Sequence, residues 1–533
     1  MNPAARAQKM EMRSATTAQE RSRVERRGPR VERQAGVPDS ALDPRPWARD
    51  TRQPTPGARR WSLVLRCLLG ASFVLAGCAR FQSKPLSPAE TAERLESRSL
   101  TNADLKLFLE RNLHREMAPW PPESWDLDTL VLAAFYYQPG LAVARAHLAV
   151  TQGGEVTAAQ RLNPSLNATP GYDTTTSIPS PWIPLTFVDI PIETAGKRKY
   201  RRAQAAHLSE AARLNLATAA WLVRSAVRSS SIELTAAERR LSLLQQELAF
   251  EEQAARLLDE QVKAGAKAAS EVAPVRLALT RLQLDVADAR RLRVGVRNRL
   301  AEAIGVPVRA LDEVNLSTAQ LRPRTSSAEL ASPEVRRTAL CSRPDVLGAL
   351  AEYAATESAL QLEIAKQYPD LRLSPGYQYD QGDNKWSLGL TVDLPILNQN
   401  QGPIAEATAK RRQAAANFAA VQSKALAELD LATQTLAVSE KNSATLQALA
   451  AEQSRRRDDV EAQLRAGAVE PLDLLSAQVE WSAAELVQLD GQLKLEQALG
   501  ALEDAVQRPL FGSGAAAPVP TSELLQIEPD ASK

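Results

Sequence analysis

The sequence predicts a mainly α-helical protein with a small β part and an internal two-fold repeat. Aromatic residues make up only 5% of the 533 residues, and the chain has three His. Two stretches, Lys197–Ala264 and Ile404–Ala466, contain neither Gly nor Pro and are long enough for helices of about 100 Å at 1.5 Å per residue. Short segments punctuated by Pro interrupt these helices, and each segment occurs twice. Together these features favour long packed rods over a stacked globular enzyme.

Residues 1–60 are predicted to be a disordered, basic extension. They hold fourteen Lys and Arg against seven Asp and Glu and show no apolar periodicity. A translation start assigned too early is the simplest explanation for them. Once residues 1–77 are set aside, the rest of the chain is net acidic, which gives no support to nucleic-acid binding.

Residues 61–77 match a secretory signal, and Cys78 is the predicted first residue of the mature protein. Arg59 and Arg60 precede the apolar run Cys67–Leu75, which is followed by two small residues and then Cys78. The run is too short for a comfortable membrane-spanning helix, although an uncleaved anchor is the alternative. The letters LAGC resemble a bacterial lipobox, in which the thiol receives a lipid and the signal is cut before the Cys. Apart from a covalent lipid on Cys78, no cofactor is expected.

An internal duplication accounts for most of the remaining chain. Five pairs of matching positions occur in the same order, 202 to 205 residues apart. These pairs are Pro139 and Pro344, Pro164 and Pro369, Gly171 and Gly376, Val188–Ile192 and Val392–Ile396, and Gln261–Ala266 and Gln463–Ala468. The predicted boundaries are a lipidated linker at 78–105, a first repeat at 106–307, an inter-repeat linker at 308–335, a second repeat at 336–507 and a flexible tail at 508–533.

Each repeat contains a predicted pair of strands. Apolar residues alternate with polar or small ones over Leu371–Tyr379 and again over Trp386–Leu394, with the polar loop Gln381–Lys385 between them. The strands of the first half, about Leu166–Asp173 and Ile183–Ile190, alternate less clearly. A tilted strand of nine or ten residues can cross a bilayer, with one face toward lipid and the other toward a wet interior. A soluble hairpin is the alternative.

The long helices are predicted to form two antiparallel hairpins. Each run ends at a Gly, Gly265 or Gly467, and a further helical segment follows. In the first run, apolar residues follow the spacing of a coiled-coil seam, with Glu251 as the one break. The seam residues are Leu234, Ala237, Leu241, Leu244, Leu248, Ala255, Leu258 and Val262. Four strands leave open edges that cannot persist in a membrane, so other copies of the chain are expected to complete the sheet.

The chain resembles the TolC-type outer-membrane factor family over residues 100–507. The resemblance rests on the two helix–hairpin–helix halves, on LTVDLPILNQNQGPIAEA (Leu390–Ala407) and on AGAVEPLDLLSAQ (Ala466–Gln478). It implies a homotrimer in which each copy gives four strands to a twelve-stranded outer-membrane β-barrel, continued by a long periplasmic α-helical coiled-coil barrel. The lipobox is similar to that of the lipoprotein branch, and Arg343–Leu371 resembles the cobalt–zinc–cadmium resistance subgroup.

The resemblance also implies a passive conduit and not an enzyme. Such a channel belongs to a tripartite efflux system, in which a periplasmic adaptor protein couples it to an inner-membrane pump, here of the resistance-nodulation-division type. The expected cargo is heavy-metal cations or drugs, and the expected location is the bacterial outer membrane, in contact with its lipid and lipid-anchored, with the helical barrel in the periplasm. The alternative is a structural coiled-coil envelope lipoprotein without channel activity, which the alternation at Trp386–Leu394 disfavours.

Four residues near the helical turns are the site residues that the resemblance implies. Gly265 and Gly467 match the tips that dock the adaptor, although a helix end commonly needs Gly for its backbone conformation in any case. Six residues further along lie Glu271 and Asp473. In the family, the second-repeat position lines the pore entrance as a ring of three carboxylates, which attracts cations. The alternative for both is a carboxylate that stabilises a helix start, and we favour this for Glu271.

Other chemistry finds little support. His114, His147 and His207 lack the spacing of metal ligands, so no metal site is predicted. No phosphate-binding GxxxxGK[ST] loop is present. The basic segment Gly196–Arg202 (GKRKYRR) follows a predicted strand, and a solvated or lipid-facing belt is a better interpretation than a nucleic-acid patch.

Overall fold

The computed structural model of the protein describes residues 81–175, 177, 179–312, 315, 337 and 340–508. The chain divides into two compact units, Met1–Pro85 and Leu86–Lys533, and only residues 81–85 of the first are described. Several predicted features lie wholly or mostly outside the described residues: the extension at 1–60, the signal at 61–77, Cys78, the linker at 308–335 and the tail at 508–533. The domain boundaries and the lipidation of Cys78 therefore stay predictions.

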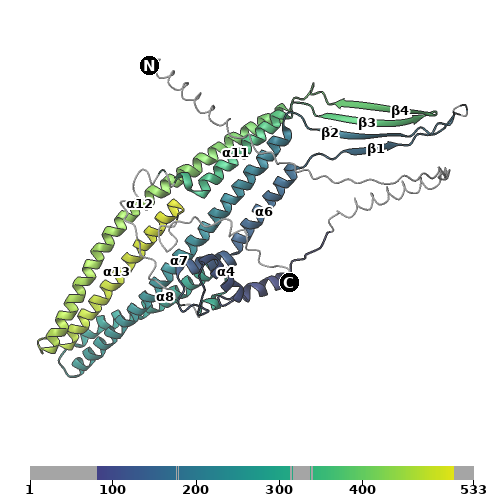
Figure 1. The fold of residues 1–533 in the computed structure, drawn as a ribbon. Coiled ribbons are helices and arrows are strands. Elements are labelled where there is room, and N and C mark those ends of the chain that lie inside the picture. The colour runs from purple at the N-terminus through teal and green to yellow at the C-terminus, as the bar shows by residue number, and fades with distance from the viewer. Residues whose placement is uncertain are drawn as a thin grey trace, which may run out of the picture. The chain divides into compact units, whose positions relative to one another are not determined.

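Long helices dominate the second unit, and its β part is one four-stranded sheet (Figure 1). The helices are α3 (Pro88–Glu96), α4 (Ala103–Leu113), α5 (Leu127–Tyr137), α6 (Pro139–Ala159), α7 (Lys197–Lys263), α8 (Val272–Ile304), α11 (Pro344–Ala365), α12 (Gln401–Arg465) and α13 (Pro471–Val506), with short 3-10 turns η2 (Ala269–Glu271) and η3 (Val308–Leu311). The strands are β1 (Ser165–Thr169), β2 (Leu185–Ile192), β3 (Leu371–Asp380) and β4 (Asp383–Val392). This confirms the predicted mainly helical fold with a small β part. Over the described ranges, no helix combines the length and the apolar character needed to cross a membrane.

The two halves repeat the same order of elements, which confirms the internal repeat. The first half runs α6, β1, β2, α7, α8, and the second runs α11, β3, β4, α12, α13. In each half a shorter helix stands end to end with the returning helix. Gln138, at the start of α6, donates to the carbonyl oxygens of Glu302 and Ala303 in α8, and Arg343 before α11 donates to that of Ala505 in α13. The helices thus form a layer of four rows: α6 with α8, then α7, then α11 with α13, then α12 (Figure 1).

The sheet is antiparallel throughout, in the order β1-β2-β3-β4, so the pairing of β2 with β3 joins the two halves. Its second hairpin corrects the predicted loop Gln381–Lys385. Only Gln381 and Gly382 lie in the turn, with φ angles of 51° and 100°, and Asp383 already pairs with Asp380. A two-residue turn with both φ angles positive follows the twist of the flanking strands, so pairing continues to the turn.

The first hairpin is shorter than the predicted strand Leu166–Asp173. Pairing in β1 stops at Thr169, and a single bridge between Tyr172 and Trp182 continues it. Pro170 stands at the interruption. Because Pro has no N–H, it cannot donate to the ladder of hydrogen bonds at this point.

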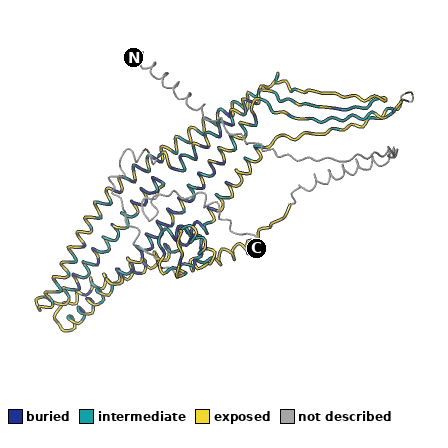
Figure 2. The backbone as a smooth tube through the Cα atoms, in the orientation of Figure 1, coloured by how far each residue is buried: buried dark blue, intermediate teal, exposed yellow. Residues whose placement is uncertain are grey.

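The main hydrophobic core lies where α4 and α5 pack against α6, α7 and α8. Trp125, Leu105, Leu109 and Leu130 are almost completely buried there. Figure 2 shows the buried stretches gathered along the middle of the long helices, whereas the strands, apart from Gly376, and the turns at the helical tips are intermediate or exposed. Within the predicted seam of the first long helix, the residues that are buried are Leu234, Ala237, Leu241, Leu244 and Leu258.

Candidate functional site

Both long helices end in the same backbone motif at the tips farthest from the sheet (Figure 1). The N–H of the residue after Gly265 donates to the carbonyl oxygen of Gln261 at 2.9 Å, and the N–H after Gly467 donates to that of Gln463 at 2.9 Å. Such a six-to-one bond needs a left-handed residue between its partners, and the two Gly supply it with φ angles of 75° and 74°. A Cβ at either Gly would meet nothing within 4 Å, so φ, and not crowding, requires Gly here.

Both predicted carboxylates cap the helix that follows each tip. Oδ2 of Asp473 accepts a hydrogen bond from the backbone N–H of Glu470 at 2.9 Å. Oε1 of Glu271 accepts one from the N–H of Ala268 at 3.2 Å. Each carboxylate therefore satisfies an N–H group at a helix start. The alternative role predicted for both residues is present in the structure, and the gate role stays a prediction.

The two carboxylates differ in their surroundings. Nζ of Lys267 lies 3.8 Å from Oε2 of Glu271, which offsets part of that charge. No basic side chain in the described part of the chain forms an ion pair with the exposed Asp473. Nε2 of Gln261 donates to Oε2 of Glu470 at 3.4 Å, so the tips of the two hairpins lie next to each other. Asp473 is therefore the better candidate for an acidic ring.

The sheet has one mainly apolar face and one mainly polar face, and the polar face also carries Leu185 and Phe187 of β2. Trp386 and Leu390 of β4 point to the same face and are 81% and 64% exposed. On the other face, Asp189 of β2 accepts hydrogen bonds from Arg372 (3.4 Å) and Ser374 (3.1 Å) of β3. A strand between lipid and a wet interior needs these two faces.

Aromatic pairs stand near the hairpin ends of the sheet. The rings of Tyr377 and Trp386 lie 4.9 Å apart, and those of Tyr172 and Trp182 lie 5.1 Å apart. Aromatic side chains are common at the level where a membrane strand meets the head groups. The outer sides of β1 and β4 pair with no strand in the part of the chain that the structure describes, so both edges of the sheet stay open.

An ion pair between a buried lysine and a half-buried aspartate joins the sheet to the helical layer. Nζ of Lys197 lies 2.7 Å from Oδ1 of Asp370 and donates to the carbonyl oxygen of Tyr368, also at 2.7 Å. The backbone N–H of Thr194 donates to Asp370 as well, at 2.9 Å. Burial by itself would raise the pKa of Asp370, but the bonds from Lys197 and Thr194 outweigh it and lower the pKa. The starts of α7 and β3 are therefore fixed to each other.

These contacts correct the predicted solvated belt at Gly196–Arg202. Lys197 is buried, and Arg198 and Arg201 donate to the carbonyl oxygens at the end of α6. Lys199 and Arg202 do stay exposed. These contacts are not predictable from the basic run itself, because the partners lie 39 to 173 residues away along the chain. The short-range pattern of a basic run carries no signal for them.

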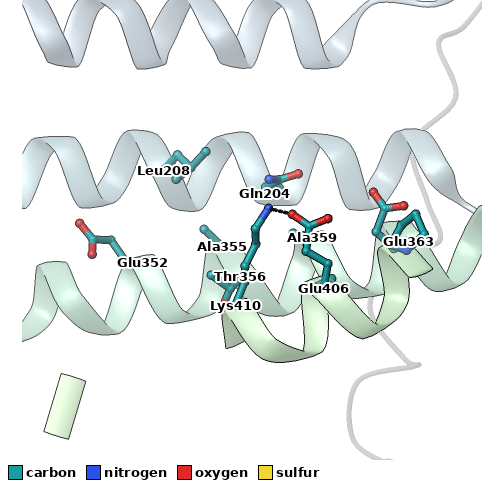
Figure 3. A pocket seen from close by; sticks show the side chains of 11 residues that line it. Gln204, Leu208, Glu352, Ala355, Thr356, Ala359, Glu363, Glu406 and Lys410 are labelled. Atoms are coloured by element: carbon teal, nitrogen blue, oxygen red, sulfur yellow. Dashed lines mark ion pairs between the residues drawn. The ribbon is translucent and has the colours of Figure 1, made fainter. Parts of the chain in front are cut away.

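A cavity of about 360 Å³ lies between α7, α11 and α12 (Figure 3). Three Glu line it, and two of them are already engaged: Glu406 pairs with Lys410 at 2.6 Å, and Glu363 accepts from Asn400 at 2.9 Å. Among the residues that the structure describes, no group of three or more His, Cys, Asp or Glu could hold a metal ion.

The sequence matches the family model described as outer membrane efflux protein over residues 134–306 and 335–506. The chain belongs to this family. One relative, the cobalt-zinc-cadmium resistance protein CzcC of Cupriavidus metallidurans, is 27% identical over 310 residues, which cover 57% of this chain and 71% of CzcC. A membrane protein from Pseudomonas aeruginosa has a similar structure, with a TM-score of 0.59 at 20% identity, over 80% of this chain and 99% of that one. The outer-membrane channel OprN gives 0.60 at 18% identity, over 80% and 98%.

These matches confirm the resemblance to TolC-type outer-membrane factors and the link to the cobalt–zinc–cadmium subgroup. The fold is that of the TolC-like channels, with one family match in each half of the duplicated chain. The protein is therefore an efflux channel of the outer membrane, a passive conduit and not an enzyme.

Proposed function

We propose that the chain works as a homotrimer and is the outer-membrane channel of a tripartite efflux system. The observation that carries this proposal is the two-faced sheet with open edges at β1 and β4. In hydrocarbon every backbone N–H and C=O needs a partner, so an open edge cannot persist there. Single-chain barrels begin at about eight strands, and the described residues of one copy form four. Three copies close a ring of twelve strands, with the polar face around the interior.

The helical layer continues this ring into the periplasm. A helix the length of α7, 67 residues, spans about 100 Å, far more than a globular domain needs. At the far end, the exposed turns at Gly265 and Gly467 present a rigid backbone motif on which a periplasmic adaptor docks. Energy comes from an inner-membrane pump of the resistance-nodulation-division type, which the adaptor couples to the channel.

Heavy-metal cations are the proposed cargo, with drugs as the alternative. Two observations support cations. The relative CzcC is named for resistance to cobalt, zinc and cadmium. Asp473, without a basic partner among the described residues, would repeat three times around the entrance of a trimer. A ring of like carboxylates concentrates cations and repels anions.

The N-terminal anchor is a covalent lipid on Cys78. The basic flank, the short apolar run and the letters LAGC support it. The alternative function, a structural coiled-coil envelope lipoprotein, would leave the apolar face of the sheet in water. With Trp386 at 81% and Leu388 at 70% exposure, such a face is an aggregation liability for a soluble hairpin.

Matched substitutions on the two faces of β4 test the channel function. Leu388→Arg places a charge on the apolar face, where it costs about 2 to 4 kcal/mol near the bilayer centre. Ser387→Arg, one residue earlier, points to the polar face. We expect the first variant to lose trimers in native mass spectrometry and conductance in planar bilayers, and the second to keep both. If the two variants assemble and conduct alike, the sheet does not lie in lipid, and the structural lipoprotein is favoured.

A further inference from the structure

A groove of about 620 Å³ opens between the end of α6 and the start of α7. It combines three basic side chains and one acid with a floor of small apolar residues. The lining residues are Glu155, Val156, Ala159, Arg198, Lys199, Arg202, Ala203 and Ala206. It lies directly below the sheet, because β2 ends at Ile192 and α7 begins at Lys197.

Most charged side chains in this groove lack an oppositely charged partner within the described part of the chain. Arg198 caps the end of α6 through the carbonyl oxygen of Ala159 at 2.9 Å. Lys199 and Arg202 are exposed, and neither makes an ion pair or a hydrogen bond with its side chain over the described ranges. Nζ of Lys199 lies 6.0 Å from the centroid of the Tyr200 ring. Glu155, half-buried on α6, is equally without an ion pair or a hydrogen bond in that part of the molecule. Two cations without an anionic partner therefore face one carboxylate without a cationic partner across an apolar floor.

The groove faces the outside of the proposed channel. Ala206 and Arg224 are eighteen residues apart, five full turns at 3.6 residues per turn, so they lie on the same side of α7. On that side Arg224 contacts Asp128 of α5 at 3.4 Å. The α4–α5 layer therefore covers this side of the helical layer at a level farther from the sheet. Inside a closed ring such a second layer of helices would fill the conduit, so this side of α7 faces outward. Gln204 and Leu208, about 200° around the helix from Ala206, line the cavity of Figure 3 instead.

The groove also lies at the level expected for the lipid head groups. The polar layer on each side of a bilayer is about 5 to 8 Å thick. Lys199 and Arg202 lie within the first two turns of α7, within about 10 Å of the start of the helix at 1.5 Å per residue. If the sheet spans the hydrocarbon, both cations lie at the level of the phosphates of the periplasmic leaflet.

We propose that this groove binds one phospholipid of the periplasmic leaflet whose head group carries a phosphate and a primary ammonium, that is, a phosphatidylethanolamine. Lys199 and Arg202 hold the phosphate, and Glu155 accepts hydrogen bonds from the ammonium. The two methylenes of the ethanolamine lie on Val156, Ala203 and Ala206, farther from the sheet than the phosphate, and the glycerol and acyl chains run from the phosphate toward the sheet. The site rests on the proposed function, since it needs the sheet to lie in the membrane. It fixes the height of each chain relative to the bilayer.

Lipid retention by the full-length protein tests the site. The protein is purified in detergent, titrated with dioleoyl phosphatidylethanolamine, and examined by native mass spectrometry. Lys199→Ala with Arg202→Ala should retain about thirtyfold less lipid, since two cations at the phosphate level are lost. The control is Arg290→Ala with Arg293→Ala on α8, which removes two exposed Arg at the same spacing away from the sheet. Equal retention by the two double variants overturns the proposal.

Two further arms identify the ligand. Glu155→Gln should lose the preference for dioleoyl phosphatidylethanolamine over dioleoyl phosphatidylglycerol, because only the first carries an ammonium for the carboxylate. An unchanged preference overturns the assignment. If inorganic phosphate displaces the lipid in proportion to its concentration, the groove is a site for free anions, and the assignment to a phospholipid is overturned. If the wild-type protein stays dispersed without detergent, the proposed function itself is refuted. If the protein is a trimer that needs detergent but the two double variants bind lipid equally, only the lipid site in the groove is refuted.

Discussion

Replacing the buried carboxylate of Glu503 by an amide should destabilise the helical layer more than any comparable change at its surface. The side chain of Glu503 in α13 is 0% exposed and forms ion pairs with Arg224 and Arg228 of α7, whose side chains are 7% and 5% exposed. Glu503→Gln keeps the shape of the side chain and removes its charge. Each buried guanidinium then keeps only a more exposed carboxylate, Asp128 at 3.4 Å for Arg224 and Asp504 at 2.7 Å for Arg228. Gly500 leaves no room to move Arg228 aside, since a Cβ there would already lie 2.9 Å from its Nε.

The magnitude follows from burial. Removing one partner of a buried ion pair costs about 3 to 5 kcal/mol. The entropy of unfolding is about 2.1 cal/mol/K per residue, which gives about 0.9 kcal/mol/K for the unit Leu86–Lys533. Divided by this entropy, the loss of stability corresponds to a fall in melting temperature of about 3 to 6 °C. Arg240 and Asp490 join the same two helices at 2.7 Å, but their side chains are 40% and 46% exposed. Asp490→Asn should cost at most about 1 kcal/mol, or about 1 °C.

Thermal unfolding followed by circular dichroism at constant detergent measures both variants. The comparison controls for the loss of a carboxylate from α13, so a difference between the variants reports burial. Equal shifts of the two melting temperatures would refute the reasoning, because they would show that the Arg224–Arg228–Glu503 cluster is no more desolvated than a surface pair.

Three other substitutions test the entrance, the anchor and the pH response. Asp473→Asn should reduce the cation preference in planar bilayers and leave the trimer intact; unchanged selectivity leaves Asp473 as a helix cap alone. Cys78→Ser should abolish acylation, and mass spectrometry of the wild type should find no residues before Cys78; an intact N-terminus in the membrane fraction contradicts this. Burial raises the pKa of Glu247, and Glu251 and Asp285 raise it further. The folded state then holds the proton more tightly, so stability falls as pH rises, and Glu247→Gln should raise the melting temperature at about pH 8, with the gain vanishing toward about pH 4. A gain independent of pH contradicts it.

The sequence predicts the backbone of this fold well wherever one residue type decides the conformation. Gly265 and Gly467 end both long helices as expected, because each stands where φ must be positive. The alternation in β3 and β4 is regular and places both strands correctly, although the turn between them is shorter than expected. In the first hairpin Pro170 removes a ladder donor, and the simple alternation rule overestimated the strand.

The side-chain contacts of the candidate sites were less predictable. The family resemblance implied both tip carboxylates, each six residues after a Gly, as pore-entrance residues, and their capping bonds agree with the alternative role. The bond between Lys197 and Asp370 spans 173 residues and crosses from one repeat to the other. In the second repeat Asn400 joins the start of α12 to α11 by donating to Glu363, whereas in the first repeat Arg198 and Arg201 join the start of α7 to the end of α6. The repeats share a left-handed residue before each long helix, Gly196 and Asn400, but not the side chains that fix it.

The open edges of the sheet and of the helical layer belong to the same ends of each chain. In the sheet they are β1 and β4, and in the helical layer they are the α6–α8 row and α12. Both helical edges expose apolar residues seven positions apart: Leu277 and Leu284 on α8 are 52% and 63% exposed, and Leu431 and Val438 on α12 are 68% and 60% exposed. A seven-residue spacing is that of a coiled-coil seam, so each edge presents an apolar stripe to a neighbouring copy. The two stripes lie at different levels, because Leu277 is 12 residues from Gly265 whereas Leu431 is 36 residues from Gly467, so each would meet a different part of the facing edge. In the proposed trimer the contact that pairs β4 with a neighbouring β1 would therefore also bury the apolar edge of the periplasmic wall.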